Sequence, residues 1–456
     1  MAQLAALASD TMKIERRYFI CLIAAIGFLS YLAGFVTTTL QVFPYSFFRE
    51  AFVSLHPNDP VVALEDSDMY VRVAPGKTGV TRADSSRTYD GYTLFSSASG
   101  PNAYLVDMAG RIVHEWSLPY SNVWNSKSAI KEPVGSNLIF WRKAYLYPNG
   151  DLLAIYESWA DHPFGYGLVK VDRNSRPLWS YLDHVHHDVE VAPDGRIYAL
   201  SHRWANDVVR SLPDYVADGH YEDFVNVISP DGRLLQRVSV LDALGNSPYA
   251  RLIGLQRTYF DPLHSNEITP VSAEWAHRLG ARGNNNVLVS LRNLDSLALI
   301  DTDAASVVWL KRGPFARQHC SDVLPNGDIT VFDNLGDMAH GASSRVIEFK
   351  PQSTQIEWEF PGDSNEQLHS PILGCAQRLP NGNTLITEGE GGRVFEVATD
   401  KQVVWEYYNP MRVGKARNFT PVVFSGRRYS PQEIHFEFNR DPQANLRVAS
   451  ATKERR

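Results

Sequence analysis

The feature that most constrains the fold of this chain is the alternation of two short repeats between about residues 94 and 426. The first repeat is an aliphatic strand pattern, a polar turn and a second strand pattern that often carries a tryptophan. It occurs at residues 104–117, 168–180, 227–240, 299–310, 346–360 and 394–406. The second repeat is a strand pattern that ends in a Pro-Asn-Gly or Pro-Asp-Gly turn, whose glycine accepts a positive φ. It occurs at residues 142–151, 187–196, 319–328 and 374–383, with a variant lacking the glycine at 264–271.

The two repeats together predict four strands per unit and six units, which is the arrangement of a six-bladed β-propeller. Long amphipathic helical patterns are absent from this region, so we expect an all-β domain over residues 91–426. The first unit lacks an inner strand, because residues 92–95 already correspond to its second strand. We expect residues 419–426 to supply the missing strand and to close the ring.

One tryptophan occupies the same position in nearly every copy of the first repeat. These residues are Trp116, Trp179, Trp309, Trp358 and Trp405, with Val238 at the corresponding place in the third unit. A large apolar ring at a repeated position is typical of packing between structural units. We therefore interpret the tryptophans as packing residues between blades.

Residues 18–40 form an uncharged, apolar stretch that is long enough to cross a bilayer as a helix. Lys13, Arg16 and Arg17 precede it and no comparable cationic cluster follows. The positive-inside rule then predicts a cytoplasmic N-terminus over residues 1–17 and a domain on the far side of the membrane. A cleaved signal peptide is the alternative, but the stretch is long for such a segment and no clear cleavage site follows it.

The segments on either side of the propeller are more polar than the propeller itself. Residues 41–90 contain proline and polar clusters, and we expect them to form a stalk between the anchor and the propeller. Residues 427–456 are expected to form a C-terminal tail, which is polar and predicted to be disordered from Arg440 onward.

Charge and cysteine content exclude several classes of protein. A net charge of -7 and a pI near 6.1 argue against nucleic-acid binding. Three cysteines cannot form a disulfide framework, and Cys21 lies in the apolar stretch. Cys320 and Cys375 hold equivalent positions on adjacent inner strands; a disulfide is conceivable there, but we expect both to be free and buried. No CxxC or HxxxH pair occurs, so the spacing predicts no metal site, and we expect no cofactor.

A histidine recurs in the second repeat, six residues before the turn proline. The five residues at this position are Arg142, His187, His264, His319 and Gly374. The first strand of each blade lines the channel of a propeller, so side chains in one register should meet at one height. Three histidines in five units are hard to obtain by chance when the chain has 14 histidines in 456 residues. We expect the three histidines and the arginine to converge at one end of the channel.

Histidine and arginine together favour an oxyanion ligand over a metal ion. Metal-binding imidazoles normally have carboxylates or other orienting groups beside them, and an arginine is a poor neighbour for a cation. The guanidinium offers a planar fork of donors to a sulfate or phosphate. A neutral imidazole can itself be a nucleophile. The set therefore predicts chemistry on an anionic group.

Several segments resemble, in their order and spacing, the bacterial arylsulfate sulfotransferases, also called arylsulfotransferase-like propeller proteins. They are residues 318–334 (QHCSDVLPNGDITVFDN), 264–269 (HSNEIT), 286–301 and 376–386. The resemblance covers about residues 100–425. It implies a six-bladed propeller that moves a sulfuryl group from an aryl sulfate ester to an acceptor hydroxyl without a nucleotide sulfate donor, a reaction of the EC 2.8.2 type.

The resemblance also implies roles for individual residues. His319 matches the nucleophilic histidine of the family, and His187 and His264 match its two accessory histidines. Arg292 matches its arginine, although residues 280–287 look like an insertion before it. In the implied ping-pong cycle, His319 becomes a sulfohistidine while Arg292 and His264 hold the sulfuryl oxygens. His187 binds the same group or transfers a proton.

Other polar residues near these motifs have weaker assignments. Arg142 matches no family role, and His369 precedes the inner strand that carries Gly374, so it could reach the channel mouth. Asp333 and Asn334 fit the stabilisation of a turn better than contact with substrate. Arg142, His369 and Asn334 are retained as candidates for substrate binding. Three further histidines are interpreted as structural, with His184 and His186 capping a loop and His202 supporting the site from outside or facing solvent.

The chain departs from the family in two ways. Cys320 follows the nucleophile, where the family often has a small or polar residue, and the N-terminal stretch predicts an anchor, whereas the family's soluble periplasmic enzymes have a cleaved leader. We expect a single-pass inner-membrane protein with a periplasmic catalytic domain. Its acceptor would be a phenol, or an envelope glycan or lipid.

Two other functions compete with this interpretation. A non-catalytic, membrane-anchored propeller scaffold could use the same histidines and arginine to bind an anionic ligand. A quinone-dependent dehydrogenase propeller is disfavoured, because the sequence has no repeated tryptophan docking motif and no calcium-type acidic cluster.

Overall fold

A computed structural model describes residues 18, 21–34, 68–73, 76–159, 161, 164–206, 219–336, 343–353, 355–361, 366–414 and 417–438. The chain divides into two compact units, residues 1–67 and 68–456. In the first unit residues 21–34 are helical. Among the described residues, no helix is both long and apolar enough to span a membrane. The remainder of the predicted anchor, apart from Tyr18, lies outside the described residues, as do residues 41–67 of the predicted stalk.

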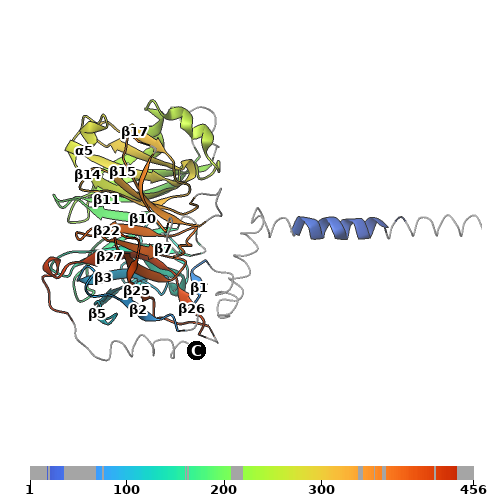
Figure 1. Cartoon of the computed structure of the whole chain (residues 1–456). Helices are drawn as coiled ribbons and strands as arrows, with labels where there is room; N and C mark the ends of the chain where they lie inside the picture. The colour runs from blue at the N-terminus through green and yellow to red at the C-terminus, as the bar shows by residue number, and fades with distance from the viewer. Residues whose placement is uncertain are drawn as a thin grey trace, which may run out of the picture. The chain divides into compact units, whose positions relative to one another are not determined.

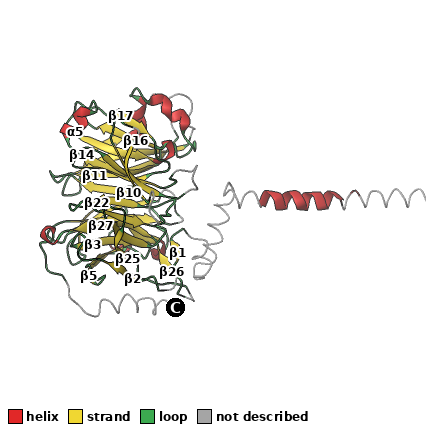
Figure 2. Ribbon diagram, viewed as in Figure 1, coloured by secondary structure: helices red, strands yellow, loops and turns green. Residues whose placement is uncertain are grey.

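The second unit is a six-bladed β-propeller, which confirms the predicted fold of this region (Figure 1, Figure 2). Each blade is an antiparallel sheet and is described here from the inner to the outer strand. Blade 1 contains β27 (Val423–Tyr429), β3 (Tyr92–Ser97), β4 (Asn102–Val106) and β5 (Ile112–Ser117). Blade 2 contains β6 (Ile139–Leu146), β7 (Leu152–Ser158), β8 (Gly165–Val171) and β9 (Pro177–Tyr181). Blade 3 contains β10 (Val185–Val191), β11 (Ile197–Ala205), β12 (His220–Ile228) and β13 (Leu234–Ser239).

The remaining three blades follow the same order along the chain. Blade 4 contains β14 (Ser265–Val271), β15 (Asn286–Leu291), β16 (Ser296–Asp301) and β17 (Ser306–Arg312). Blade 5 contains β18 (His319–Val323), β19 (Ile329–Asp333), β20 (Arg345–Phe349) and β21 (Ile356–Phe360). Blade 6 contains β22 (Cys375–Arg378), β23 (Thr384–Glu388), β24 (Arg393–Val397), β25 (Val403–Tyr408) and a fifth strand, β2 (Gly79–Ala83).

Short helices occupy the loops between strands. They are η1 (Tyr120–Asn122), η2 (Ser136–Leu138), α4 (Val240–Gly245), η3 (Ala250–Leu255), α5 (Ala273–Arg278), η4 (Arg292–Leu294) and η6 (Pro431–Glu433). Both α-helices begin at a serine, Ser239 and Ser272, whose side chain accepts a hydrogen bond from the backbone of the first turn. η4 begins with Arg292, which is one of the predicted catalytic residues.

Apolar packing between neighbouring blades holds the ring together. Six clusters of buried side chains each join two adjacent blades. Between blades 6 and 1, for example, Leu385 and Trp405 pack in one cluster with Phe95 and Tyr104. Because a second-position strand such as β7 is covered on both faces, it is buried along its whole length. This explains why the first four residues of its sequence are all aliphatic rather than alternating with polar ones.

The tryptophans of the first repeat pack between blades, as predicted. The indole Nε1 of Trp116 in blade 1 donates to the carbonyl oxygen of Gly150 in the turn of blade 2, at 3.0 Å. Trp179 makes the same kind of bond to Pro230 in blade 3, and Trp405 of blade 6 reaches Met108 in blade 1. Each of these three rings therefore contacts the next blade through its apolar body and its one polar atom.

The strand that closes the propeller comes from the C-terminal part of the chain. β27 pairs antiparallel with β3, so residues 423–429 complete blade 1 as its inner strand (Figure 1). The fully buried Arg428 lies 3.2 Å from Glu396 of blade 6 and donates to Thr93 of blade 1 at 2.8 Å. The predicted closure is confirmed, although the strand extends to Tyr429 rather than ending at residue 426.

Two segments that we assigned to the flanks belong to the propeller. β1 (Tyr70–Arg72) pairs with β26 (Phe419–Pro421), and β2 adds an edge strand to blade 6. This part of the stalk prediction is corrected: β2 is half exposed, so its sequence lacks the apolar character of an inner strand. After β27, the side chains of Phe436 and Phe438 pack against the cluster of blades 1 and 2, so the predicted tail is also partly folded. Residues 439–456 lie outside the described residues.

Cys320 and Cys375 form a disulfide bond, with their Cα atoms 4.9 Å apart. Our expectation that both thiols are free was wrong. Cys320 lies on β18 and Cys375 on β22, and these inner strands of adjacent blades approach each other closely enough for a bridge. The bond links blades 5 and 6 directly after His319.

Candidate active site

The inner strands that carry the candidate residues are irregular at the site. A bulge interrupts the ladder in each of them, between Trp141 and Ala144, His186 and Val189, Ser265 and Glu267, and His319 and Ser321. His187 and His264 have φ angles of 55° and 51°, which non-glycine residues rarely adopt. Bulges redirect side chains, and strained backbone of this kind occurs mainly at functional sites. The backbone of each inner strand is therefore distorted at or next to its candidate histidine.

Arg142, His187, His264 and His319, which we call the inner-strand cluster, lie close together. The ring centroids of His187 and His264 are 5.2 Å apart. Burial lowers the pKa of both His187 and His319 well below the usual value, and Arg142 and His264 act on both rings in the same direction. Four residues from four different blades thus share one electrostatic environment, which is poor in solvent and favours neutral imidazole rings.

The imidazole of His319 is held in one orientation and one tautomer. Asn334 donates its amide nitrogen to the backbone oxygens of Ser370 and Leu373, at 2.6 and 2.9 Å. Its Oδ1 must therefore accept from Nδ1 of His319, at 2.7 Å. With the proton on Nδ1, Nε2 of His319 carries a free lone pair. Both ends of the Asn334 amide are occupied by these partners, an arrangement that suits a positioning role.

The backbone of His319 is also fixed from blade 4. Gln318 is fully buried and donates to the Ser290 hydroxyl at 2.9 Å and to the Ser296 carbonyl at 3.0 Å. The carbonyl oxygen of Gln318 accepts from the side chain of Asn266 at 2.8 Å. The Gln-His dipeptide therefore works as a unit, with the glutamine anchoring the strand and the histidine facing its partners on blade 5.

His264 and Arg292 lie side by side on blade 4. Nδ1 of His264 is 2.5 Å from Oδ2 of Asp261, and the backbone N–H of Arg292 donates to the His264 carbonyl at 3.3 Å. The Nε atom of Arg292 is buried and has no hydrogen-bond partner among the described residues. Burial, with a smaller effect of Arg317, lowers the pKa of Arg292 to about 10, so the group stays charged at neutral pH. An unused, charged donor beside His264 suits an anionic ligand.

Glu157 of β7 connects the other two members of the cluster. Its Oε1 accepts from the backbone N–H of His187 at 2.5 Å, and its Oε2 lies 3.7 Å from Nε of Arg142. The Arg142 guanidinium also lies over the ring of Phe424, 4.9 Å from its centroid. Arg142 is therefore held in place from two sides.

Several carboxylates surround Lys143 farther along the inner strands. Lys143 forms ion pairs with Asp188, with Glu190 at 2.9 Å and with Glu267 at 3.8 Å. Burial and the Asp188 carboxylate raise the pKa of Glu267 well above its usual value. The Lys143 ammonium is thus occupied by carboxylates, whereas Nε of Arg292 has no partner among the described residues, so an anionic ligand is favoured at the inner-strand cluster.

Some assignments from the sequence differ from the structure. The exposed His369 makes its described hydrogen bond through its backbone N–H, to Glu388 at 2.7 Å, and no described contact joins it to the inner-strand cluster. His186 does not cap a loop: it lies within β10, is buried, and stacks on the buried His202 with 4.3 Å between ring centroids. The signal missed was the cross-strand register, which places both rings on one face of blade 3.

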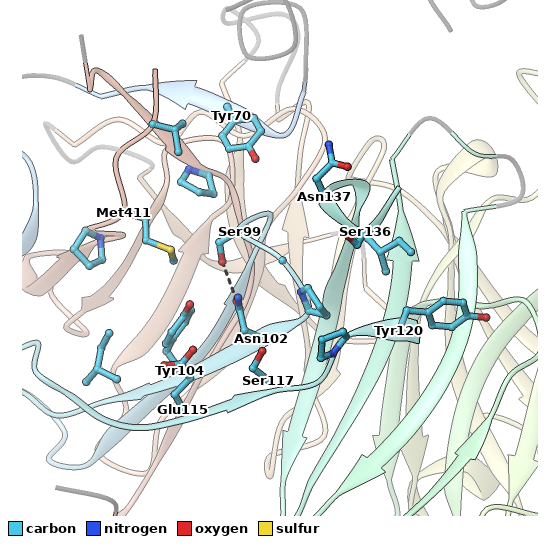
Figure 3. A pocket seen from close by; sticks show the side chains of 18 of the residues that line it. Tyr70, Ser99, Asn102, Tyr104, Glu115, Ser117, Tyr120, Ser136, Asn137 and Met411 are labelled. Carbon is cyan, nitrogen blue, oxygen red and sulfur yellow. Dashed lines mark hydrogen bonds between the residues drawn. The ribbon is translucent and has the colours of Figure 1, made fainter. Parts of the chain in front are cut away.

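A separate cavity of about 1140 Å³ opens beside blade 1. Figure 3 shows Tyr104, Glu115 and Ser117 of this blade lining it, with Ser99 bonded to Asn102. None of the residues of the inner-strand cluster lines this cavity. We therefore place the candidate chemistry at the inner-strand cluster.

Comparison with known proteins identifies one family. Residues 143–410 match the family model described as arylsulfotransferase (ASST). No curated protein matches the chain. Several solved structures are distantly similar to this chain. A Bacteroides caccae protein of unknown function is 14% identical, with 73% of this chain and 99% of that chain covered and a TM-score of 0.47.

Two other solved structures are less similar. Virginiamycin B lyase from Staphylococcus aureus is 11% identical, with 76% of this chain and 89% of that chain covered and a TM-score of 0.39. The WD40 propeller domain of Doa1 is 12% identical, with 76% and 98% covered and a TM-score of 0.34. Likeness at this level carries no information about activity.

Proposed function

Since this chain belongs to the arylsulfotransferase family, we propose that it transfers a sulfuryl group from an aryl sulfate ester to an acceptor hydroxyl through a sulfohistidine at His319. The observation that carries the proposal is the fixed tautomer of His319. Asn334 accepts the Nδ1 proton, so the lone pair of Nε2 is available to attack sulfur. The depressed pKa of His319 keeps this lone pair unprotonated at neutral pH.

In the first half-reaction, Nε2 of His319 forms a bond to sulfur while the bond from sulfur to the aryl oxygen breaks. The phenolate leaves with the bonding electron pair. Negative charge on the sulfuryl oxygens is stabilised by Arg292, whose Nε has no partner among the described residues, and by His264, whose ring is oriented by Asp261. Fixed donors of this kind are effective because the site excludes much of the surrounding water.

In the second half-reaction, the acceptor hydroxyl attacks the sulfur of the sulfohistidine and its proton moves to a base at the site. Nε2 of His187 is suited to this transfer after it has given its proton to the departing aryl oxygen in the first half-reaction. Its ring lies next to that of His264, 5.2 Å away between centroids. Arg142, held by Glu157, adds positive charge to the cluster. The bond from sulfur to Nε2 then breaks, and His319 regains its lone pair.

We further propose that the propeller is anchored in the inner membrane, with its catalytic domain in the periplasm. Support comes from Lys13, Arg16 and Arg17 before the uncharged stretch 18–40. The acceptor of an anchored enzyme would be a phenol, or an envelope glycan or lipid.

The direct test is to incubate the protein with a chromogenic aryl sulfate and no acceptor. We expect one phenolate to be released per chain, and the mass of one sulfuryl group to appear on the peptide containing His319. His319→Ala should abolish both signals, while His369→Ala, which changes an exposed histidine outside the cluster, should leave both intact. Arg292→Lys should fold normally but lose about 10²- to 10³-fold in rate, because an ammonium cannot reproduce the two-pronged contact.

Two outcomes would count against the proposal. A folded His319→Ala protein that still transfers the sulfuryl group would remove His319 as the nucleophile and make His264 the next candidate. Anion binding without any covalent adduct, weakened in both variants, would favour the scaffold function.

A further inference from the structure

Three polar side chains on one face of blade 3 lie close together and are not used in the proposed sulfuryl transfer. They are His186 on β10, His202 on β11 and Asp223 on β12, and we call them the blade-3 triad. His202 and Asp223 are direct cross-strand partners, and His186 pairs with Leu200, two residues before His202. The register therefore places all three side chains on the same face.

The triad is buried, and two of its nitrogen atoms lack hydrogen-bond partners among the described residues. His186 is 2%, His202 9% and Asp223 3% exposed. Among the described residues, the Nε2 atoms of both histidines have no hydrogen-bond partner. Buried polar atoms without partners are rare, because each loses its hydration without compensation. Two of them beside a buried carboxylate indicate that something is bound there.

The distances fit a metal ion. One ligand atom from each residue lies within 4.8 Å of the other two, and Nε2 of His186 is 3.8 Å from Oδ1 of Asp223. Two ligands about 2.1 Å from a tetrahedral zinc ion are about 3.4 Å apart, so small side-chain rotations would complete the site. The other Asp223 oxygen accepts from the backbone N–H of Ser265 at 2.7 Å, which orients the carboxylate.

We propose that Nε2 of His186, Nε2 of His202 and a carboxylate oxygen of Asp223 bind one divalent transition-metal ion of the zinc type. Two imidazoles and a carboxylate form a common ligand set for such ions and leave a coordination position open. This inference reverses our sequence-based expectation of no metal, and it does not depend on the proposed sulfuryl transfer.

The metal would also determine a tautomer in the inner-strand cluster. A histidine that binds metal through Nε2 carries its proton on Nδ1 and donates it to a second group. Nδ1 of His186 lies 2.7 Å from Nδ1 of His187. His187 would then accept at Nδ1 and carry its own proton on Nε2. The ion would thereby prepare His187 to donate a hydrogen bond.

The test measures metal content, not activity. The untagged full-length protein is stripped with a chelator, dialysed against Zn²⁺ and assayed for bound zinc, and Co²⁺ is titrated as a spectroscopic probe. We expect one ion per chain and the visible absorption of four- or five-coordinate Co²⁺. His202→Asn and Asp223→Asn should each weaken binding by at least about 100-fold, since loss of a mere supporting group already costs 10- to 100-fold.

A matched control is His114→Asn, which removes a buried imidazole on β5 of blade 1. It should bind zinc as the unchanged protein does. If the triad variants fail to fold, anomalous diffraction from zinc-soaked crystals of the unchanged protein decides the question: a peak between the two Nε2 atoms supports the site. A peak elsewhere, no peak, or zinc well under one ion per chain overturns it. A metal-loaded protein without sulfuryl transfer would count only against the proposed function.

Discussion

Removal of the disulfide between Cys320 and Cys375 should lower the stability of the propeller substantially. The bond spans 55 residues of sequence. In the loop-entropy treatment, a crosslink that closes a loop of this length restricts the unfolded chain by about 4 kcal/mol at 25 °C. The double variant Cys320→Ala, Cys375→Ala should therefore unfold at a lower denaturant concentration than the oxidised protein. For a domain of this size, with an m-value of about 4 kcal/mol per molar urea, the midpoint should fall by about 1 M.

Urea unfolding followed by tryptophan fluorescence measures this shift. A reductant should shift the midpoint of the unchanged protein toward that of the double variant and leave the variant itself unaffected. Cys21→Ser is the matched control, because Cys21 is an exposed free thiol and its loss should change nothing. Equal midpoints for the oxidised protein and the double variant would refute the argument that this bond restricts the unfolded chain. A shift under reductant in the variant would show that the effect does not come from the disulfide.

Three further predictions concern the site and the anchor. Asn334→Leu should lower kcat at least 10-fold with little change in KM, because Asn334 no longer fixes the tautomer of His319. It should also cost about 1–3 kcal/mol of stability for each backbone carbonyl left unpaired. A variant with full kcat would contradict the positioning role of Asn334. The acid limb of kcat/KM should lie below pH 6.5, since a depressed pKa leaves His319 unprotonated to lower pH, and Arg292→Gln should move this limb to higher pH by removing a cation. An unchanged limb would show that Arg292 does not act on the nucleophile. A reporter fused after Arg456 should be active only outside the cytoplasm, and cytoplasmic activity would reverse the predicted topology.

The inner-strand cluster was predictable because its signal is local and repeated. The turn proline sets the register of each inner strand, and His187, His264 and His319 recur at one distance from it. The structure brings these three residues and Arg142 together, although through bulges that the pattern did not show. The roles of these residues in catalysis stay predictions.

The blade-3 triad was not predictable in the same way. His186 and His202 come from different strands, and neither follows a metal-binding spacing, so each looked structural when taken alone. Their contact depends on how β10 pairs with β11, and the register there includes a bulge. The orientation of Asn334 likewise depends on two carbonyl oxygens from a loop about forty residues away in sequence.

By itself the sequence determined the six repeated units, the closing strand and the residues that stand six positions before the turn proline of each inner strand. It could do so because turn chemistry and strand periodicity act over a few residues. Only the tertiary structure decided that Cys320 pairs with Cys375, that β2 joins blade 6 and that His186, His202 and Asp223 meet. Those contacts depend on the distances between neighbouring blades and on the register between paired strands. The packing of the whole ring determines both.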